Sequence, residues 1–184
     1  MLFRSARYQF RGRAVFMGTV LMLLMVPGVV TLFPMYWIFV RLGWIDTHVP
    51  LIVPGLTGAY PVFFMRQYMK RLPDEILESA RIDGCSEYRI FWSIALPMIK
   101  PALVTLAIFT FMGSWNSFLW PWILIKSKHL YTLPLALYNT EDPLVPNFNV
   151  VMAASGISVI PLLLIFAIFH RSFLQGQMAG AIKG

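Results

Sequence analysis

Four long apolar runs constrain the fold of this chain more than any other feature. They occupy residues 14–40, 51–69, 101–124 and 150–169 and are rich in Leu, Ile, Val, Phe and Met. A helix needs about 20 apolar residues to cross a bilayer, and backbone polar groups inside lipid must be satisfied within the segment. The first run has about 27 residues, too long for the apolar core of a signal peptide. We therefore predict an all-α polytopic membrane protein with four transmembrane helices.

The composition agrees with this fold class. Hydrophobic residues make up 58% of the 184 residues and charged residues 12%, and the mean hydropathy is +0.69, whereas soluble domains carry about 25% charged residues. The single cysteine, Cys85, excludes a disulfide framework and a cysteine zinc site, so we expect it to pack. The net charge of +7 would suggest nucleic acid in a soluble protein, but orientation in the bilayer explains it better here.

The basic residues predict the orientation of the spans. Twelve of the 15 Lys and Arg residues fall within residues 1–13, 66–100 and 171–183, and the other three are Arg41, Lys126 and Lys128. Cytoplasmic loops carry an excess of Lys and Arg. We therefore expect both termini in the cytoplasm, residues 41–50 and 126–149 as outer loops, and residues 73–101 as a cytoplasmic loop.

Helix-breaking and polar residues interrupt the predicted spans. Pro27 and Pro34 fall in the first run, and Gly113 and Asn116 fall near the middle of the third. Such residues are tolerated at membrane depth where neighbouring helices or a cavity satisfy the polar groups. They either kink packed helices or line a path through the protein.

The cytoplasmic loop is the only long stretch that resembles a soluble protein, and its sequence predicts two short helices joined at Gly84. We expect Asp74 to be the N-cap of the first helix and Gly84 to supply the turn at positive φ. The expected apolar stripe of this helix is Ile76, Leu77 and Ala80. The loop also holds five of the eight acidic residues, Asp74, Glu75, Glu78, Asp83 and Glu87.

The second helix of the loop has its own start and stop signals. Ser86 is the predicted N-cap, and Pro97 and Pro101 are expected to close the helix. The apolar face is predicted to consist of Ile90, Phe91, Ile94 and Ala95. A polar segment of this kind between membrane spans indicates a partner outside the bilayer.

The spacing of small and acidic residues in this loop resembles the EAA loop in permease subunits of bacterial ABC importers. Glu78-Ser79-Ala80 is followed after three residues by Gly84, and after nine more by Ile94-x-Leu96-Pro97, with Ser79 where Ala is usual. The resemblance implies that the two helices dock in a groove of an ATPase subunit. The implied docking residues are Glu78, Ser79, Ala80, Asp83, Gly84, Ile94, Leu96 and Pro97.

The resemblance implies a role for individual residues of the loop, and each role has a simpler alternative. Glu78 would face a basic group of the ATPase and Ala80 would allow close packing; otherwise the carboxylates only keep the loop soluble. Arg81 and Arg89 either pair with acids of the ATPase or face solvent or lipid phosphates.

Other segments are similar to the carbohydrate branch of this family, the maltose and glycerol-3-phosphate type. They include the Trp115-Asn116 pair, the Thr132-Leu133-Pro134 turn and the terminal Gly-Ala-x-Lys-Gly at 180–184. Members of this branch have six spans, so we expect two N-terminal spans to be missing through truncation or a misassigned start, or the sequence to be a fragment.

The resemblance implies a non-catalytic permease subunit that moves a sugar or sugar-like solute across the bacterial inner membrane. The alternative is a truncated membrane protein that only binds the ATPase. The chain lacks the G-x-x-x-x-G-K-[ST] phosphate loop, so ATP hydrolysis would belong to a separate subunit. Further expected partners are a second, different permease, an extracytoplasmic solute-binding protein and membrane lipid; no cofactor, metal or nucleic acid is expected.

Sugars bind proteins through hydrogen bonds and stacking on aromatic rings, which suggests candidates for the solute path. These residues either line the path or only pack helices together. They are Trp115, Asn116, Ser117 and Ser155.

Overall fold

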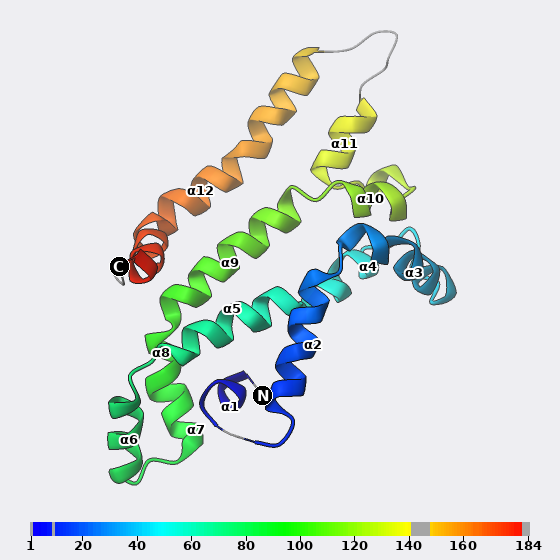
Figure 1. Ribbon diagram of the computed structural model, residues 1–184. Helices are drawn as coiled ribbons and strands as arrows, with labels where there is room; N and C mark the ends of the chain where they lie inside the picture. Colours follow the sequence, from blue (N-terminus) through cyan, green and yellow to red (C-terminus); the bar gives the residue numbers. More distant parts are fainter. Residues whose placement is uncertain (1, 9, 141–147, 182–184) are drawn as a thin grey trace. The chain divides into compact units, whose positions relative to one another are not determined.

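The computed structural model describes residues 2–8, 10–140 and 148–181 (Figure 1). These residues form helices, turns and loops, with no strand among them, which confirms the all-α prediction. The chain divides into two compact units, each described by itself below. The first is made from the described parts of residues 1–26, 59–107 and 171–184, and the second from those of residues 27–58 and 108–170.

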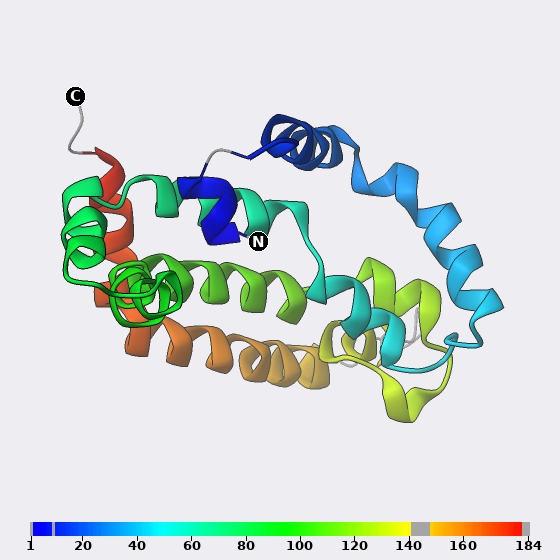
Figure 2. The ribbon, with the colours of Figure 1, turned by 90° about the horizontal axis from the view of Figure 1, so that it is seen from below.

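The first unit is built around α5. Both α1 and α2 pack against this helix (Figures 1 and 2). Its buried core contains Ala6 of α1, Met65 and Met69 of α5, and Ala95, Ile99 and Ala102 further along the chain. The helices of this unit are α1 (Leu2–Arg7), α2 (Arg13–Met25), α5 (Ala59–Lys70), α6 (Asp74–Ile82), α7 (Glu87–Ile90), the π-helical η2 (Phe91–Ala95), α8 (Leu96–Met98) and the start of α9 (Lys100–Trp115).

The second unit contains α3 (Gly28–Arg41), α4 (Val49–Ile52), the 3₁₀ helix η1 (Val53–Leu56), the remainder of α9, α10 (Leu119–Leu124), the 3₁₀ helix η3 (Lys128–Leu130), α11 (Leu133–Thr140) and most of α12 (Phe148–Ala181). The segment 126–149, expected to be an outer loop, therefore contains a helix, α11. Residues 141–147 of that loop and residues 182–184 of the terminal motif lie outside the described residues.

Asp46 joins two segments of the second unit that are distant in sequence. Its backbone has φ 59°, and its amide donates to the carbonyl of Leu124 at 2.8 Å. Its carboxylate accepts from the amides of Lys126 and Ser127 at 2.8 Å each, and from the Ser127 hydroxyl at 2.5 Å. These hydrogen bonds, that of the Ser127 hydroxyl first, lower the pKa of Asp46 to about 2.

Within the described part of the chain, two helical segments are long and apolar enough to cross a membrane, residues 49–70 and 148–169. Two further pairs of helices qualify there if each pair counts as one broken span. The first pair is α2 and α3, which meet at Val26 and Pro27, both in extended conformation. The second joins residues 87–98 to α9 with a bend of 66°. The upper count agrees with the four predicted spans, whose bounds stay predictions.

Candidate functional site

The helix α6 ends in the turn that the sequence predicted. Gly84 has φ +77°, its amide donates to the Arg81 carbonyl at 3.0 Å, and the Cys85 amide donates to the Ala80 carbonyl at 3.0 Å. This pair of bonds is a Schellman motif, which favours glycine at the left-handed position. The prediction for Gly84 is confirmed. The turn reverses the chain between α6 and α7.

The start of α6 differs from the prediction. Pro73 precedes the helix in an extended conformation, and Asp74 is its first residue, so the expected N-cap role of Asp74 is wrong. Its carboxylate instead accepts a hydrogen bond from Arg7 Nη1 at 2.5 Å, and Arg7 also donates to the Leu72 carbonyl. The first turn of α6 is therefore attached to α1, because an arginine at the end of that short helix reaches it.

The second helix starts as predicted but ends later. The Ser86 hydroxyl accepts from the Arg89 amide at 3.4 Å, which confirms the N-cap. The helix then widens into η2, continues past Pro97 to Met98 and breaks at Ile99, so the prediction that Pro97 closes it is wrong. Pro97 lies within the continuous helical segment, directly after the π-helical η2, and Pro101 lies in the first turn of α9, where a proline needs no backbone donor. We call residues 74–98 the hairpin.

The hairpin has a small core of its own. Leu77 is 1% exposed, and it packs with buried Ala80 and Ile90. Phe3 of α1, Cys85 and Ile94 cover this core. The apolar face predicted for the second helix is thus buried or half-buried, including Phe91, Ile94 and Ala95. The apolar stripe predicted for the first helix, α6, is wrong for one residue, because Ile76 is 41% exposed.

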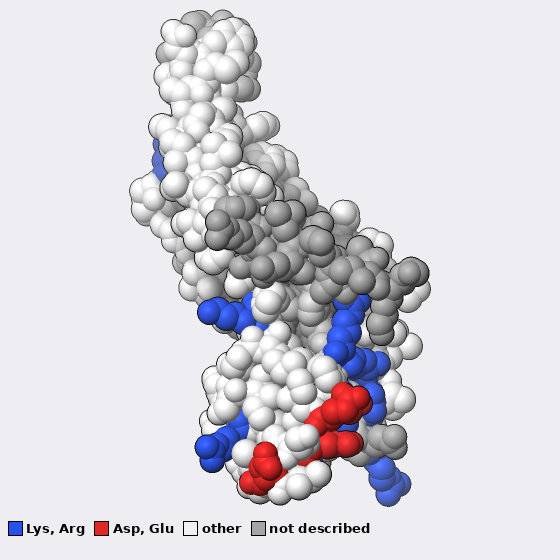
Figure 3. Space-filling view, turned by 90° about the vertical axis from the view of Figure 1, so that its left-hand side faces the viewer, with Lys and Arg blue, Asp and Glu red and all other residues white. Residues whose placement is uncertain are grey.

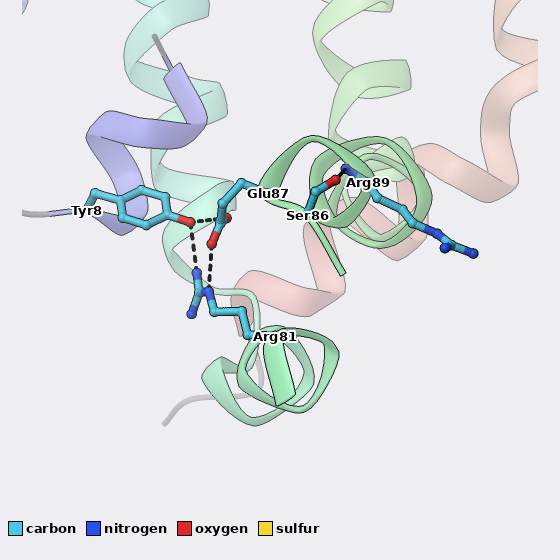
Figure 4. Close-up of polar contacts among 5 residues, drawn as sticks. All are labelled: Tyr8, Arg81, Ser86, Glu87 and Arg89. Carbon is cyan, nitrogen blue, oxygen red and sulfur yellow. Dashed lines mark hydrogen bonds and ion pairs between the residues drawn. The ribbon is translucent and has the colours of Figure 1, made fainter. Parts of the chain in front are cut away.

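Three charged or polar side chains link the two helices of the hairpin to the N-terminal segment (Figure 4). Arg81 Nε donates to Glu87 Oε1 at 2.8 Å, Arg81 Nη2 donates to Tyr8 Oη at 2.9 Å, and the Tyr8 hydroxyl donates to Glu87 Oε2. We call Tyr8, Arg81 and Glu87 the polar triad. Arg81 therefore has partners within the chain, which the sequence could not assign.

The electrostatics of the triad follow from these bonds. The bonds to Glu87 and then Tyr8 raise the pKa of Arg81, and the bond from Arg81 lowers the pKa of Glu87. Burial, followed by the bond to Glu87, raises the pKa of Tyr8. At neutral pH the triad holds one positive and one negative charge and a neutral phenol, so it is electrostatically matched.

The expected docking residues divide into an exposed and a packed group. Glu78, Ser79, Asp83, Gly84 and Pro97 are exposed, Ile94 and Leu96 are half-buried, and Ala80 is buried. On the face shown in Figure 3, acidic side chains gather on the part of the first unit that carries α6 and α7. Ala80 contributes close packing inside the hairpin, against Leu77 and Ile90.

Three of the most exposed apolar residues of the hairpin were not predicted from the sequence. Ile82 is 86% exposed, Tyr88 75% and Trp92 51%, and the rings of Tyr88 and Trp92 lie 6.1 Å apart. Tyr88 and Trp92 are four residues apart on a helix and fall outside the stripe of Ile90 and Ile94, which was the signal available in the sequence. An exposed apolar group beside carboxylates is typical of an interaction surface.

The candidates for the solute path all lie in the second unit. Trp115 is half-buried, its Nε1 donates to the Ser158 carbonyl of α12 at 3.0 Å, and its ring stacks on Phe111 at 5.7 Å. Asn116 is exposed, and its side-chain Nδ2 donates a hydrogen bond to the Met112 carbonyl at 3.0 Å. Ser117 is half-buried and Ser155 is exposed. Trp115 therefore joins α9 to α12, one turn from Ser155, and the path role of these residues stays a prediction.

Comparison with known proteins matches this chain to one family of transport proteins and to several of their permease subunits. The family described as binding-protein-dependent transport system inner membrane component matches residues 3–177. The chain is 37% identical over 179 residues to the arabinooligosaccharides transport system permease protein AraQ of Halalkalibacterium halodurans, covering 97% of this chain and 64% of that protein. It is 33% identical over 171 residues to the sn-glycerol-3-phosphate transport system permease protein UgpE of Pectobacterium atrosepticum, covering 92% and 61%.

A solved structure shares the fold. It is the crystal structure of a bacterial ABC transporter involved in the import of the acidic polysaccharide alginate, with a TM-score of 0.80 and 22% identity, covering 94% of this chain and 66% of that chain. The present chain spans less than two thirds of the length of both curated relatives. The family expected from the spacing of residues 78–97 is confirmed: the chain belongs to the binding-protein-dependent transport system inner membrane components.

Proposed function

We propose that this chain is a permease subunit of an ATP-driven importer for a sugar or sugar-like solute, and that the hairpin docks in a groove of a separate ATPase subunit. The observation that carries the proposal is the hairpin itself, a packed two-helix element with exposed apolar and acidic residues. Family membership supports the transport role. The relatives named for arabinooligosaccharides and glycerol phosphate support a polyhydroxylated solute.

The construction of the hairpin suits the transmission of a movement. A glycine turn, the Ser86 cap and the Leu77 core fix its two helices to each other. Such an element moves as a rigid body when force is applied at its surface. ATP-driven closure of the ATPase subunits would move it and change the side of the membrane to which the solute path opens.

The exposed surface indicates the chemistry of the partner groove. Tyr88, Trp92 and Ile82 would fill an apolar floor, since buried aromatic residues supply much of the energy at interfaces. Glu78 and Asp83 are exposed and take part in neither of the ion pairs found among the described residues. We expect basic side chains on the rim of the groove, because complementary charge favours the correct partner.

The remaining parts of the importer follow from the same proposal. A second permease, in a heterodimer with this one, would complete the path, and an extracytoplasmic solute-binding protein would deliver the solute. The chain would be a multi-pass inner-membrane protein with both termini in the cytoplasm, as the excess of Lys and Arg in residues 1–13, 66–100 and 171–183 favours. Trp115, Asn116, Ser117 and Ser155 would face the solute.

Capture of the ATPase subunit by the full-length protein in detergent tests the docking. We expect Trp92→Ala to weaken capture by on the order of 30-fold, as loss of about 2 kcal/mol at an interface hot spot implies. Trp122 is the matched control, since it is also 51% exposed and has an aromatic neighbour, Phe118, at 6.2 Å. Trp122→Ala should capture normally.

Glycine substitutions give a second, independent pair of variants. Gly84→Asp strains the hairpin turn, and Gly43→Asp introduces a comparable strain at φ +67° outside the hairpin. Loss of capture only in Gly84→Asp supports docking through the hairpin. Equal capture by wild type, Trp92→Ala and Gly84→Asp would refute it.

A further inference from the structure

A pocket with a basic lining lies in the first unit, where α2 starts beside α5. Phe10, Gly12, Arg13, Ala14, Met17 and Arg66 line it. Lys70 follows Arg66 by one helical turn on α5, so both side chains leave the same face of that helix. The pocket therefore combines an apolar wall from residues 10–17 with basic groups from two helices.

The positive charges of this pocket have no negative partner among the described residues. The charges of Arg13 and Arg66 both act on Lys70, and that of Arg13 acts on Arg66. The two ion pairs found in the described part of the chain are elsewhere, at Asp74 and Glu87. Three mutually repelling cations near one pocket would be stabilised by an anion.

Burial makes this imbalance more costly at Arg66. This residue is only 4% exposed, and its Nε donates to the Ser5 carbonyl at 3.2 Å. Arg13 Nη1 donates to another carbonyl, that of Tyr8, at 3.4 Å. Both acceptors are neutral, so the hydrogen bonds satisfy donors without compensating charge. A buried cation that lacks a counter-ion is strongly destabilising.

We propose that this pocket binds a phosphate group, carried by an anionic phospholipid. The charged residues stand where a headgroup would be, since Arg13 is the first residue of α2 and Lys70 the last of α5, at the expected cytoplasmic ends of two spans. Basic pockets between helices on this side bind anionic headgroups. Phe10, Ala14 and Met17 would contact the apolar part of the lipid.

Occupancy of this pocket would also bear on the hairpin. The segment that carries Arg13 also carries Arg7, which binds Asp74 of α6, and Tyr8, which belongs to the polar triad. A lipid phosphate bridging Arg13 and Lys70 would hold this segment against α5. The proposal depends on the membrane location of the family but not on docking of an ATPase.

Lipid binding to the purified full-length protein, without ATPase, tests the proposal. The protein is stripped of lipid in detergent and titrated with phosphatidylglycerol, and bound lipid is counted by native mass spectrometry. Loss of one charge-assisted contact in Arg13→Gln or Lys70→Gln should weaken binding about tenfold. Arg11→Gln is the matched control, because Arg11 is exposed, is absent from the pocket lining and, unlike Arg13, is not among the charges that act on Arg66 and Lys70. It should change affinity less than twofold. Arg66 is left unchanged because its burial makes substitution a risk to folding.

Two competing ligands distinguish the source of the phosphate. Phosphatidylcholine, which has no net charge, should bind more weakly than phosphatidylglycerol, and inorganic phosphate should not displace the lipid. Full displacement by inorganic phosphate would overturn the lipid as occupant. Equal weakening by Arg11→Gln and Arg13→Gln, or absence of binding in the wild type, would overturn the pocket as a site. Because the lipid titration contains no ATPase subunit, a negative result would overturn the lipid site without bearing on the docking of the hairpin.

Discussion

Removal of the Tyr8 hydroxyl should loosen the hairpin while leaving its helices intact. In Tyr8→Phe the ring remains, but Glu87 loses a donor and Arg81 loses an acceptor. In Glu87→Gln both bonds lose the assistance of the carboxylate charge. The two variants remove different parts of the same network, so their effects should not add.

The expected size follows from exposure. The side chains of Arg81 and Glu87 are 37% and 51% exposed, so solvent screens the ion pair and leaves about 0.5–1 kcal/mol. The hydrogen bond from Tyr8 adds about 1 kcal/mol. We expect local opening of the hairpin to become easier by about 1 kcal/mol in Tyr8→Phe and up to about 2 kcal/mol in Glu87→Gln. These values correspond to roughly 5–30-fold faster amide exchange.

Hydrogen–deuterium exchange of peptides covering residues 76–92 measures this opening. The control is Tyr131→Phe, which removes another tyrosine hydroxyl bond, from Tyr131 to the Lys126 carbonyl at 3.4 Å, in the second unit. It should leave exchange in the hairpin unchanged. Unaltered exchange in both Tyr8→Phe and Glu87→Gln would refute the view that the triad holds the hairpin.

The pH dependence gives a further check on the triad. The pKa of Glu87 is lowered in the folded protein, so its contribution is present above about pH 4.5, near the ordinary glutamate value, and is lost as the pH falls through the folded pKa. The pKa of Tyr8 is raised, so its contribution is present below about pH 10 and is lost as the pH rises through the folded pKa. Protection of the hairpin should therefore decline at both extremes.

Three more substitutions test the packing of the hairpin core and the hydrogen bonds of Asp46 to residues 126 and 127. Leu77→Ala should destabilise the hairpin by about 2–5 kcal/mol, because Leu77 is buried in its core, whereas Ile82→Ala should cost under about 0.5 kcal/mol; exchange of α6 measures both. Asp46→Asn should lower the midpoint of thermal denaturation, followed by tryptophan fluorescence, by the same margin at pH 7 and pH 5. The wild-type carboxylate stays ionised at both values, and its contribution is lost only as the pH falls from about 3.8 towards its folded pKa of about 2.

Local sequence signals predicted the parts of the hairpin that depend on neighbouring residues. Gly84 was identifiable because a left-handed turn favours glycine, and Ser86 because its hydroxyl can bond a free amide of the next turn. Asp74 carried the same kind of signal, yet Arg7 binds its carboxylate. A partner 67 residues away leaves no trace in local spacing. Tyr8 was missed as a partner of Arg81 for the same reason, since the two are 73 residues apart.

The course of the chain from the hairpin into α9 could not be predicted from the sequence either. The sequence places two prolines near the end of the second helix, and both favour a stop there. Pro97 lies inside the helical segment that runs to Met98 and Pro101 in the first turn of α9, so neither ends a helix, and the break occurs between them at Ile99. Periodicity could not predict η2 either, since a π-helical segment shifts the faces of a helix without changing its composition.

The packing around Ile99 shows how the hairpin is joined to α5 and to the helix that follows it. Ala95 precedes the break and Ala102 follows it, and both are buried with Ile99 against Met65 and Met69 of α5. Close-packed interiors transmit displacement because they have few voids in which to absorb it. We therefore expect the 66° bend, which has a buried residue at its corner, to keep its angle when the hairpin is displaced. In the proposed importer, force applied to the hairpin would then displace α5 and the start of α9 together.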